Sequence, residues 1–213
     1  MAFSDLDTRT KLTERFEEVL AVAARLIAKD GFERASIRAI AQEAALSQAG
    51  LYHYVESKEE LLFLIQKHTF TALRNSLAAR LDPDAGPLER LRVMIRNHLE
   101  FFLAHMDELR VCTFDYNKLS GEHFNQILPI RRDYFRIAHS IVKDVLNENG
   151  TRPINSKRAT LYLFGTLNWI HMWFRTERRT NIELIAEEIT GMVLWGIGDR
   201  NGVATSGGEK GRA

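Results

Sequence analysis

Apolar residues recur at helical spacing almost throughout this 213-residue chain, and only four prolines interrupt it. This periodicity predicts an all-α fold of about nine helices. Glycines, prolines and capping residues mark their ends, and we place the last five helices near residues 88–105, 107–118, 122–148, 155–176 and 181–198. A chain of this length has room for one large domain, or for a small domain joined to a larger one.

The two ends of the chain and its single cysteine restrict the kind of protein that it can be. Residues 1–12 are polar and lack an apolar segment, which predicts a flexible arm and no signal peptide. The glycine-rich tail at 199–213 is predicted to be disordered. Cys112 alone excludes an internal disulfide and fits a reducing compartment. The longest uncharged run, residues 159–174, is shorter than the ~20 residues of a membrane span. We therefore expect this run to form a buried helix of a cytoplasmic protein without a membrane segment.

Three helices are predicted between the arm and residue 55. The first follows Thr13, its predicted N-cap, and ends at Gly31, because glycine readily adopts the left-handed conformation found at helix C-termini. Ser36 and Ser47 are predicted to cap the second and third helices, which a three-residue turn, "ALS", joins. Two short helices joined by such a turn have the proportions of a helix-turn-helix.

The third helix opens with "SQAGLYHYV", a composition suited to a DNA groove. In a helix-turn-helix the first residues of the second helix face base edges in the major groove. Gln48 carries an amide that can read adenine through two hydrogen bonds. Ala49 and Gly50 are small, so the helix end can approach the DNA backbone closely. Hydroxyl and imidazole groups able to contact phosphates follow on Tyr52, His53 and Tyr54.

The fourth helix is predicted to begin after Ser57 and to run to about residue 81, with Glu60 completing a capping box. Lys58 lies in its first turn, where the helix dipole disfavours a cation. A docked phosphate would remove this conflict. The alternative is a surface lysine balanced by Glu59 and Glu60, and beside the preceding run we favour the phosphate contact.

Net charge gives no evidence for nucleic-acid binding. The chain carries a formal charge of +1, and residues 1–58 contain eight lysines and arginines against nine acidic residues. This balance argues against an architectural DNA protein, which needs a strongly basic surface. DNA binding must therefore depend on where individual charges lie.

No motif in the sequence points to catalysis or to a metal. The metalloprotease, di-iron, nucleophile-elbow and phosphate-loop motifs are absent from it. His98 and His105 lie seven residues apart on one helical face, without a cysteine or an evident carboxylate to complete a metal site. We therefore expect a protein that is not an enzyme and holds no cofactor.

The N-terminal part closely resembles the DNA-binding signature of the TetR/AcrR family of transcriptional regulators, over "SIRAIAQEAALSQAGLYHYVESKEELL" at residues 36–62. The capped turn, the tyrosine and the lysine recur in the register of the family. By position, the resemblance implies phosphate-side contacts on the second helix, a base-reading third helix and a phosphate-binding lysine. These positions are Ser36 and Arg38, then Ser47, Gln48, Ala49, Gly50, Tyr52, His53 and Tyr54, and finally Lys58.

The chain departs from this family pattern at three places. Ala45 stands where the turn usually has glycine, so alanine must adopt that turn or tolerate strain in it. Ala49 and Gly50 are transposed relative to the common order, and Val55 replaces the usual phenylalanine. None of these changes removes an expected DNA contact.

The resemblance also implies a division of the chain and an assembly. Residues 1–57 would form the helix-turn-helix domain and residues 58–198 an effector-binding and dimerisation domain. The last two helices would form a four-helix bundle with a second subunit, and Gly165, Gly191 and Gly196 would allow close approach. An apolar stripe suited to this contact lies on Ile182, Ile185, Ile189, Met192 and Val193. The alternative is that this stripe belongs to the core of a single chain. Both roles are compatible if different faces of the helix fill them.

Residues 161–197 resemble, more loosely, a FadR-like TetR subgroup, several members of which respond to fatty-acyl or steroid-derived coenzyme A thioesters. Asn168 and His171 are polar groups on an apolar helix, which need partners and are therefore pocket candidates. Arg131, Arg132 and Arg136 could meet phosphates at a cavity mouth. The aromatic residues expected to line the cavity are Phe101, Phe102, Phe114, Tyr116, Phe135, Trp169 and Trp173. The alternative for each of these side chains is an ordinary place in the core.

Together these inferences predict a homodimeric repressor that binds a near-palindromic double-stranded DNA operator. A small apolar effector, such as a fatty-acyl-coenzyme A, would release it. Two alternatives stay open. One is a regulator of a multidrug efflux operon that responds to aromatic or cationic drugs, and the other is a regulator controlled by a protein partner.

Overall fold

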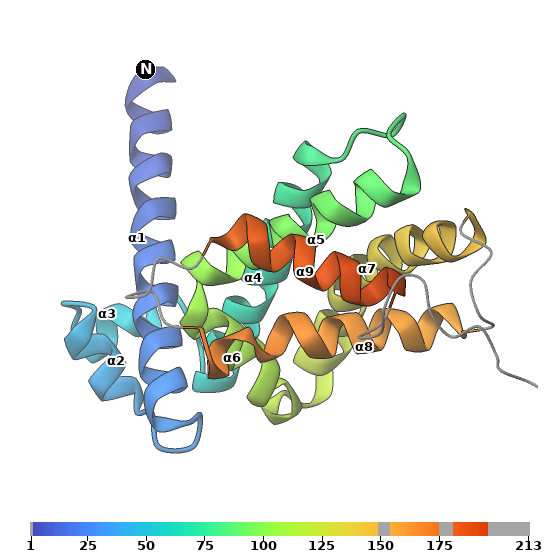
Figure 1. Ribbon diagram of the computed structural model, residues 1–213. Helices are drawn as coiled ribbons and strands as arrows, with labels where there is room; N and C mark the ends of the chain where they lie inside the picture. Colours follow the sequence, from blue (N-terminus) through green and yellow to red (C-terminus); the bar gives the residue numbers. More distant parts are fainter. Residues whose placement is uncertain (1, 149–153, 175–180, 196–213) are drawn as a thin grey trace, which may run out of the picture.

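The computed structural model describes residues 2–148, 154–174 and 181–195, and within these ranges every regular element is helical (Figure 1). The all-α prediction is therefore confirmed. The α-helices are α1 (Ala2–Asp30), α2 (Ile37–Glu43), α3 (Gln48–Tyr52), α4 (Lys58–Arg80), α5 (Pro87–Ala104), α6 (Met106–Phe114), α7 (Gly121–Glu148), α8 (Ser156–Asn168) and α9 (Ile182–Trp195). Two short 3-10 helices, η1 (Tyr116–Lys118) and η2 (Trp169–Met172), follow α6 and α8.

Three of the four helix caps that the sequence predicts are present. The Ser36 and Ser47 hydroxyls accept hydrogen bonds from the backbone amides three residues later, at 3.1 and 2.9 Å. The Ser57 hydroxyl accepts from the Glu60 amide at 3.0 Å. The Glu60 carboxylate reaches back to the amide of Glu56, one residue before the expected partner, at 2.5 Å. Local side chains therefore set where α2, α3 and α4 begin.

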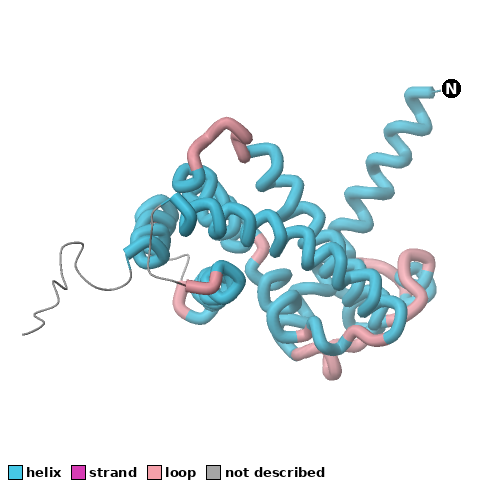
Figure 2. The backbone as a smooth tube through the Cα atoms, turned by 90° about the vertical axis from the view of Figure 1, so that its right-hand side faces the viewer, coloured by secondary structure: helices cyan, strands magenta, loops and turns pink. Residues whose placement is uncertain are grey.

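Residues 2–12, predicted as a flexible arm, are helical in the structure, because α1 already begins at Ala2. Thr13, the expected cap, lies inside this helix. Residues 2–30 contain no glycine or proline that would interrupt the backbone hydrogen bonds. The first turns of α1 project beyond the other helices in both views (Figures 1 and 2). The tail at 199–213 lies outside the described residues.

Buried side chains form two clusters. The N-terminal core joins α1, α2, α3 and the first turns of α4, with Val111, Leu119 and Ile127 packed against them. The C-terminal core joins the later turns of α4 with α5 and α7–α9. Helix α4 contributes Leu61 and Ile65 to the first cluster and Leu73 and Leu77 to the second. One continuous helix therefore connects the two cores.

Residues 159–174 do not form the single buried helix that the sequence predicts. Helix α8 ends at Asn168, and the chain continues as η2. Several large side chains of this run lie in solvent, among them Leu161, Tyr162 and Trp173, which are 52, 63 and 53% exposed. The run looked buried because it is apolar on every side, but its own chain covers only one face. Within the described residues, no helix is long and apolar enough to cross a membrane.

Ala45 occupies a position that glycine usually fills. Its φ is +52°, in the left-handed region. The amide of Leu46 donates to the Ala41 carbonyl at 2.8 Å, and the Ala45 amide donates to the Gln42 carbonyl at 3.1 Å. This is the hydrogen-bond pattern of a Schellman cap, with Ala45 as its left-handed residue. The turn of the helix-turn-helix therefore keeps the geometry usual for glycine, at a conformational cost.

Replacing Ala45 with glycine is expected to stabilise the protein by about 1 kcal/mol, because glycine adopts this φ without the Cβ clash. The alanine side chain is exposed, so little packing is lost. Urea denaturation followed by circular dichroism should give a higher midpoint with an unchanged slope. Ala49→Gly, at the exposed start of α3, is the control and should lower the midpoint. An A45G variant less stable than the parent would contradict the assigned strain.

Candidate nucleic-acid interface and ligand cavity

Helix α3 presents a short polar face to solvent. Gln48, Ala49, Tyr52 and His53 are exposed, and the Tyr52 side chain is 47% accessible. Leu51, in the same helix, is fully buried in the N-terminal core. The capped end of α3 thus points the Gln48 amide and the small Ala49 outward, while Leu51 fixes the helix to its support.

Two expected contact residues have an additional structural task. Tyr54 is half-buried, and its ring stacks on Phe16 of α1 with the centroids 5.8 Å apart. Gly50 lies under the cap of α3, where a Cβ would come within 3.2 Å of the Ser47 hydroxyl oxygen. The glycine therefore leaves room for the cap that starts the helix. Ser36, itself a cap, and Arg38 are exposed on the side of α2.

Lys58 has intramolecular partners that the sequence does not reveal. Its Nζ donates to the carbonyl oxygens of Phe32 and Glu33 at 2.9 and 3.2 Å, and it lies 4.5 Å from the centroid of the Phe32 ring. These carbonyls compensate the cation at the start of α4, which removes the conflict with the helix dipole. An ammonium has three N–H donors, so one of them is left for a further acceptor.

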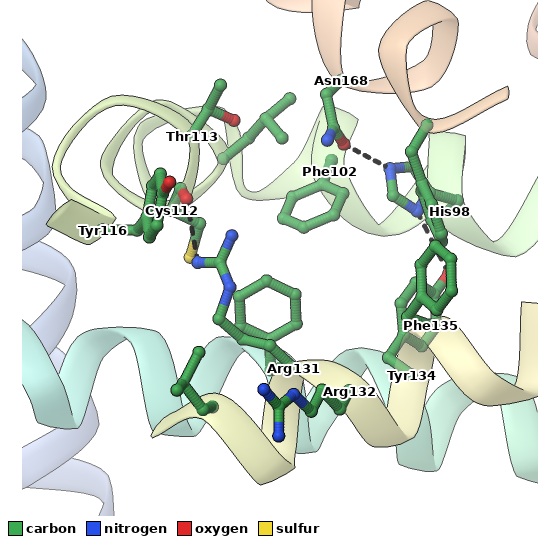
Figure 3. A pocket seen from close by; sticks show the side chains of 14 residues that line it. His98, Phe102, Cys112, Thr113, Tyr116, Arg131, Arg132, Tyr134, Phe135 and Asn168 are labelled. Atoms are coloured by element: carbon green, nitrogen blue, oxygen red, sulfur yellow. Dashed lines mark hydrogen bonds between the residues drawn. The ribbon is translucent and has the colours of Figure 1, made fainter. Parts of the chain in front are cut away.

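A cavity of about 380 Å³ lies among α4–α8 (Figure 3). Four residues of the expected aromatic and polar set line it, namely Phe102, Tyr116, Phe135 and Asn168, and so do Arg131 and Arg132. The other lining side chains were not expected from the sequence. They are Phe70, His98, Leu109, Cys112, Thr113, Leu128, Tyr134 and Phe164.

Five expected cavity residues lie elsewhere. Phe101 stacks on His105, with the ring centroids 4.4 Å apart, and Phe114 is 51% exposed. Trp169 and Trp173 lie on the outer face of the molecule, each 53% exposed. His171 donates from Nδ1 to the Asn168 carbonyl at 2.7 Å, and among the described residues its buried Nε2 has no partner. These five side chains do not line this cavity, because composition does not reveal which way a helix is rotated.

His98 is the centre of a buried polar network on the cavity wall. Its Nε2 is 3.1 Å from Asn168 Oδ1, and its Nδ1 is 3.1 Å from the Tyr134 hydroxyl (Figure 3). The amide oxygen can only accept, so Nε2 carries the proton and the tyrosine donates to Nδ1. Burial lowers the pKa of His98 to about 4 and raises the pKa of Tyr134, so the network is neutral at pH 7.

Arg131 is the charged group of the cavity interior. Its guanidinium donates to Gln66 Oε1 at 3.2 Å and to the Cys112 carbonyl at 3.1 Å. It lies between two rings, 4.7 Å from the Phe70 centroid and 4.9 Å from the Tyr116 centroid. Burial lowers its pKa, and burial also raises the pKa of the Cys112 thiol to about 12, so the thiol carries no compensating charge. Arg132, by contrast, is exposed.

The segment between α6 and α7 joins this cavity to the N-terminal helices. Tyr116 of η1 lines the cavity. The backbone amide of Phe32 donates to the Asp115 carboxylate, and Lys118 pairs with Glu33 at 3.0 Å. On the far side of η1, Ser120 donates to Glu59 Oε1 from its amide at 2.7 Å and from its hydroxyl at 2.9 Å. One short segment thus contacts both the cavity and the support of α2 and α3.

The outer face of α8 and α9 forms a second, open hollow of apolar character. Within α9, Ile185 and Ile189 are buried in their own chain, so that part of the apolar stripe is intrachain core. Gly165 has no atom within 4 Å of the place where a Cβ would stand. Gly196 lies outside the described residues. The exposed apolar side chains of this face are Leu161, Tyr162, Trp169, Trp173, Leu184 and Met192.

Among the described residues, no group of three or more histidine, cysteine, aspartate or glutamate side chains is placed to hold a metal ion. Within the described part of the chain, the exposed α3 face is suited to DNA and the cavity beside Arg131 to a small ligand.

Known proteins resemble the chain along most of its length. The repressor KstR2 of Mycobacterium tuberculosis (strain H37Rv) is 22% identical over 189 residues, which cover 88% of this chain and 94% of KstR2. The fatty acid metabolism regulator protein of Bacillus subtilis (strain 168) is 17% identical over 185 residues, which cover 86% of this chain and 95% of that protein. The crystal structure of AibR in complex with isovaleryl coenzyme A and operator DNA matches with a TM-score of 0.75 and 28% identity, covering 84% of this chain and 97% of AibR.

Two family models match. Residues 19–65 match the bacterial regulatory proteins of the tetR family, and residues 84–197 match the tetracyclin repressor-like C-terminal domain. The second match alone spans more than half of the chain. With the helix-turn-helix geometry of α2 and α3 and the all-helical remainder, these matches show that the chain belongs to the TetR family of bacterial transcriptional regulators.

Proposed function

We propose that this protein is a ligand-responsive transcriptional repressor, which binds a near-palindromic operator as a homodimer and leaves it when a small effector enters the cavity. Residues 1–57 would bind DNA, and residues 58–198 would bind the effector and the second subunit. The observation that carries this proposal is the segment 115–120, because it lines the cavity at Tyr116 and is bonded to Phe32, Glu33 and Glu59.

The exposed face of α3 suits a major groove. Gln48 stands free of the core at the capped helix start, where an amide can pair with adenine. Tyr52, His53, Ser47 and Arg38 are exposed around it and would contact phosphates. The remaining N–H of Lys58 is a further phosphate donor in this proposal.

Gln48→Ala is expected to weaken binding to the operator by roughly 10-fold or more, since a bidentate base contact contributes about 1–3 kcal/mol of discrimination. Fluorescence anisotropy with an operator duplex selected from the DNA that flanks the gene, and with a scrambled duplex, measures the effect. The loss should be confined to the operator. Tyr52→Phe should weaken both complexes alike, because a phosphate contact carries no sequence information.

Gln126→Ala is the matched control, because this glutamine is exposed on α7, in the C-terminal part of the chain. It should leave both affinities unchanged. Operator binding that survives Gln48→Ala and Tyr52→Phe together would remove α3 from the proposed interface.

The outer face of α8 and α9 is the proposed contact with a second copy of this chain. This face exposes large apolar side chains, with more than half of the surface of Leu161, Tyr162 and Trp169 accessible to solvent. A contiguous apolar area of this kind marks an interaction site. A two-fold axis would bring the same face of both subunits together. Such a dimer presents two α3 helices to successive major grooves, roughly 34 Å apart or a multiple of that distance.

Leu161→Arg is expected to separate the subunits, because it places an unpaired charge in the proposed apolar contact. Size-exclusion chromatography with light scattering should give the mass of one chain, where the parent protein gives two. Operator affinity should fall with it, since one α3 helix reads only half of a palindrome. Ser140→Arg, which adds the same charge on the exposed side of α7, should remain a dimer. A dimeric L161R variant would place the subunit contact elsewhere.

The relatives suggest the effector class. AibR was crystallised with isovaleryl coenzyme A and operator DNA, and another relative is named for fatty acid metabolism. We therefore infer an effector with an apolar acyl group in the cavity, and coenzyme A thioesters are one class to test. The exposed Arg132 and Arg136 could meet their phosphates. Cationic drugs are disfavoured, because the described lining includes Arg131 and contains no carboxylate.

Release would follow from the contacts of η1. An acyl group that displaces Tyr116 moves residues 115–120, and with them the partners at Phe32, Glu33 and Glu59. The spacing of the two α3 helices would then no longer fit the operator.

Octanoyl-coenzyme A or octanoate is expected to dissociate the operator complex in an anisotropy titration, while coenzyme A without an acyl group should not. Thr113→Phe places a ring in the cavity and should abolish release with little change in operator affinity. If neither acyl compound nor longer and branched homologues released the operator, the acyl effector would be excluded. The family assignment and the α3 interface would be unaffected.

A further inference from the structure

We propose that Arg131 is the anchor for a carboxylate, so that the cavity selects a small apolar acid, ionised and bound by its head group inside the protein. This inference rests on the proposed function and specifies the chemical class of the effector. The relatives suggest coenzyme A thioesters, whose charges lie on phosphates far from the acyl group. The side chains of this cavity favour a charge within it.

The first ground is the missing counter-ion. The two polar acceptors of the Arg131 guanidinium are neutral, the Gln66 amide oxygen and the Cys112 carbonyl. No carboxylate of the described residues pairs with it or lines the cavity. Arg131 is partly buried. Removing much of a guanidinium from water without an anion is unfavourable, and contacts with two aromatic rings offset only part of this. A bound carboxylate would supply the missing charge through paired N–H donors.

The second ground is a neighbouring donor without a partner. The Gln66 side chain is fully buried, and its amide oxygen is held by Arg131. Its Nε2, on the same carbon, has no acceptor among the described residues. A buried amide donor of this kind needs an acceptor. Gln66 is not itself among the lining residues, so an anion would have to be seated on the Arg131 guanidinium to accept from this Nε2.

The rest of the cavity suits an apolar chain of limited size. Phe102, Phe135 and Phe164 form its walls, and the His98 network is neutral and already satisfied. A volume of about 380 Å³ stands at the low end of the ~300–1,000 Å³ usual for small-molecule sites. It accommodates a short or medium acyl chain with its carboxylate, while the nucleotide of coenzyme A would have to remain outside.

The test compares acids with their neutral amides on the full-length protein. Isothermal titration calorimetry measures hexanoate, octanoate and 4-phenylbutyrate, each against the corresponding amide, and octanoyl-coenzyme A in parallel. The acids that bind should do so about 10- to 100-fold more tightly than their amides, as expected for hydrogen bonds to a charged group. Arg131→Met should abolish this difference, and Arg131→Lys should retain part of it.

Arg110→Met is the control, because it removes the same charge from the exposed side of α6. It should keep the full preference for acids. Operator affinity and thermal unfolding of each variant report whether it is folded, and the acid-to-amide comparison on the parent protein needs no variant.

Three results would overturn the proposal. In the first, acids and amides bind equally, or no acid binds. In the second, Arg131→Met keeps the preference for acids. In the third, octanoyl-coenzyme A binds while octanoate does not, and Arg131→Met weakens the thioester, which would assign Arg131 to a phosphate. All three leave operator release by acyl compounds standing, whereas failure of release by every acyl compound would instead remove the proposed effector.

Discussion

Helix α4 is the constraint on which both halves of the molecule depend. A helix holds its residues at a fixed rise and rotation, so Leu61 in the N-terminal core and Leu77 in the C-terminal core cannot move independently. Phe70, between them, lines the cavity, and Lys58 at the start of the helix holds the carbonyls of the segment before α2. Whatever repacks the cavity wall therefore acts on the element that supports α3.

The two polar groups of the cavity differ in how they satisfy burial. His98 is neutral and has a partner at each ring nitrogen, which is the ordinary solution for a buried histidine. Arg131 keeps a charge that no described carboxylate balances, although Phe70 and Tyr116 lie against it. This contrast indicates that His98 shapes the cavity wall, whereas Arg131 is suited to binding a ligand. Because Tyr116 belongs to η1, the same arginine also lies beside the connection to the N-terminal helices.

Sequence patterns predicted the features that a few neighbouring residues decide. Ser36, Ser47 and Ser57 cap the helices that they were expected to cap, because each bond spans only three residues. The segment before Thr13, predicted as an arm, is helical instead, since the absence of glycine and proline lets α1 begin at Ala2. Phe102 lines the cavity while its neighbour Phe101 does not, since successive helical residues point in different directions. Which direction faces a cavity depends on the packing of other helices.

By itself, then, the sequence determined the helical class, the caps and the composition of the α3 face, all of which arise from bonds within one or two helical turns. Only the tertiary structure decided the partners of buried polar groups. The His98 network joins residues from α5, α7 and α8, and Arg131 meets Gln66 and Cys112 from two further helices. The electrostatic state of a buried group depends on the burial and the charges around it, and distant segments supply both. The sequence suggested Arg131 as a cavity residue, but no pattern along the chain could show that no carboxylate of the described residues balances its charge.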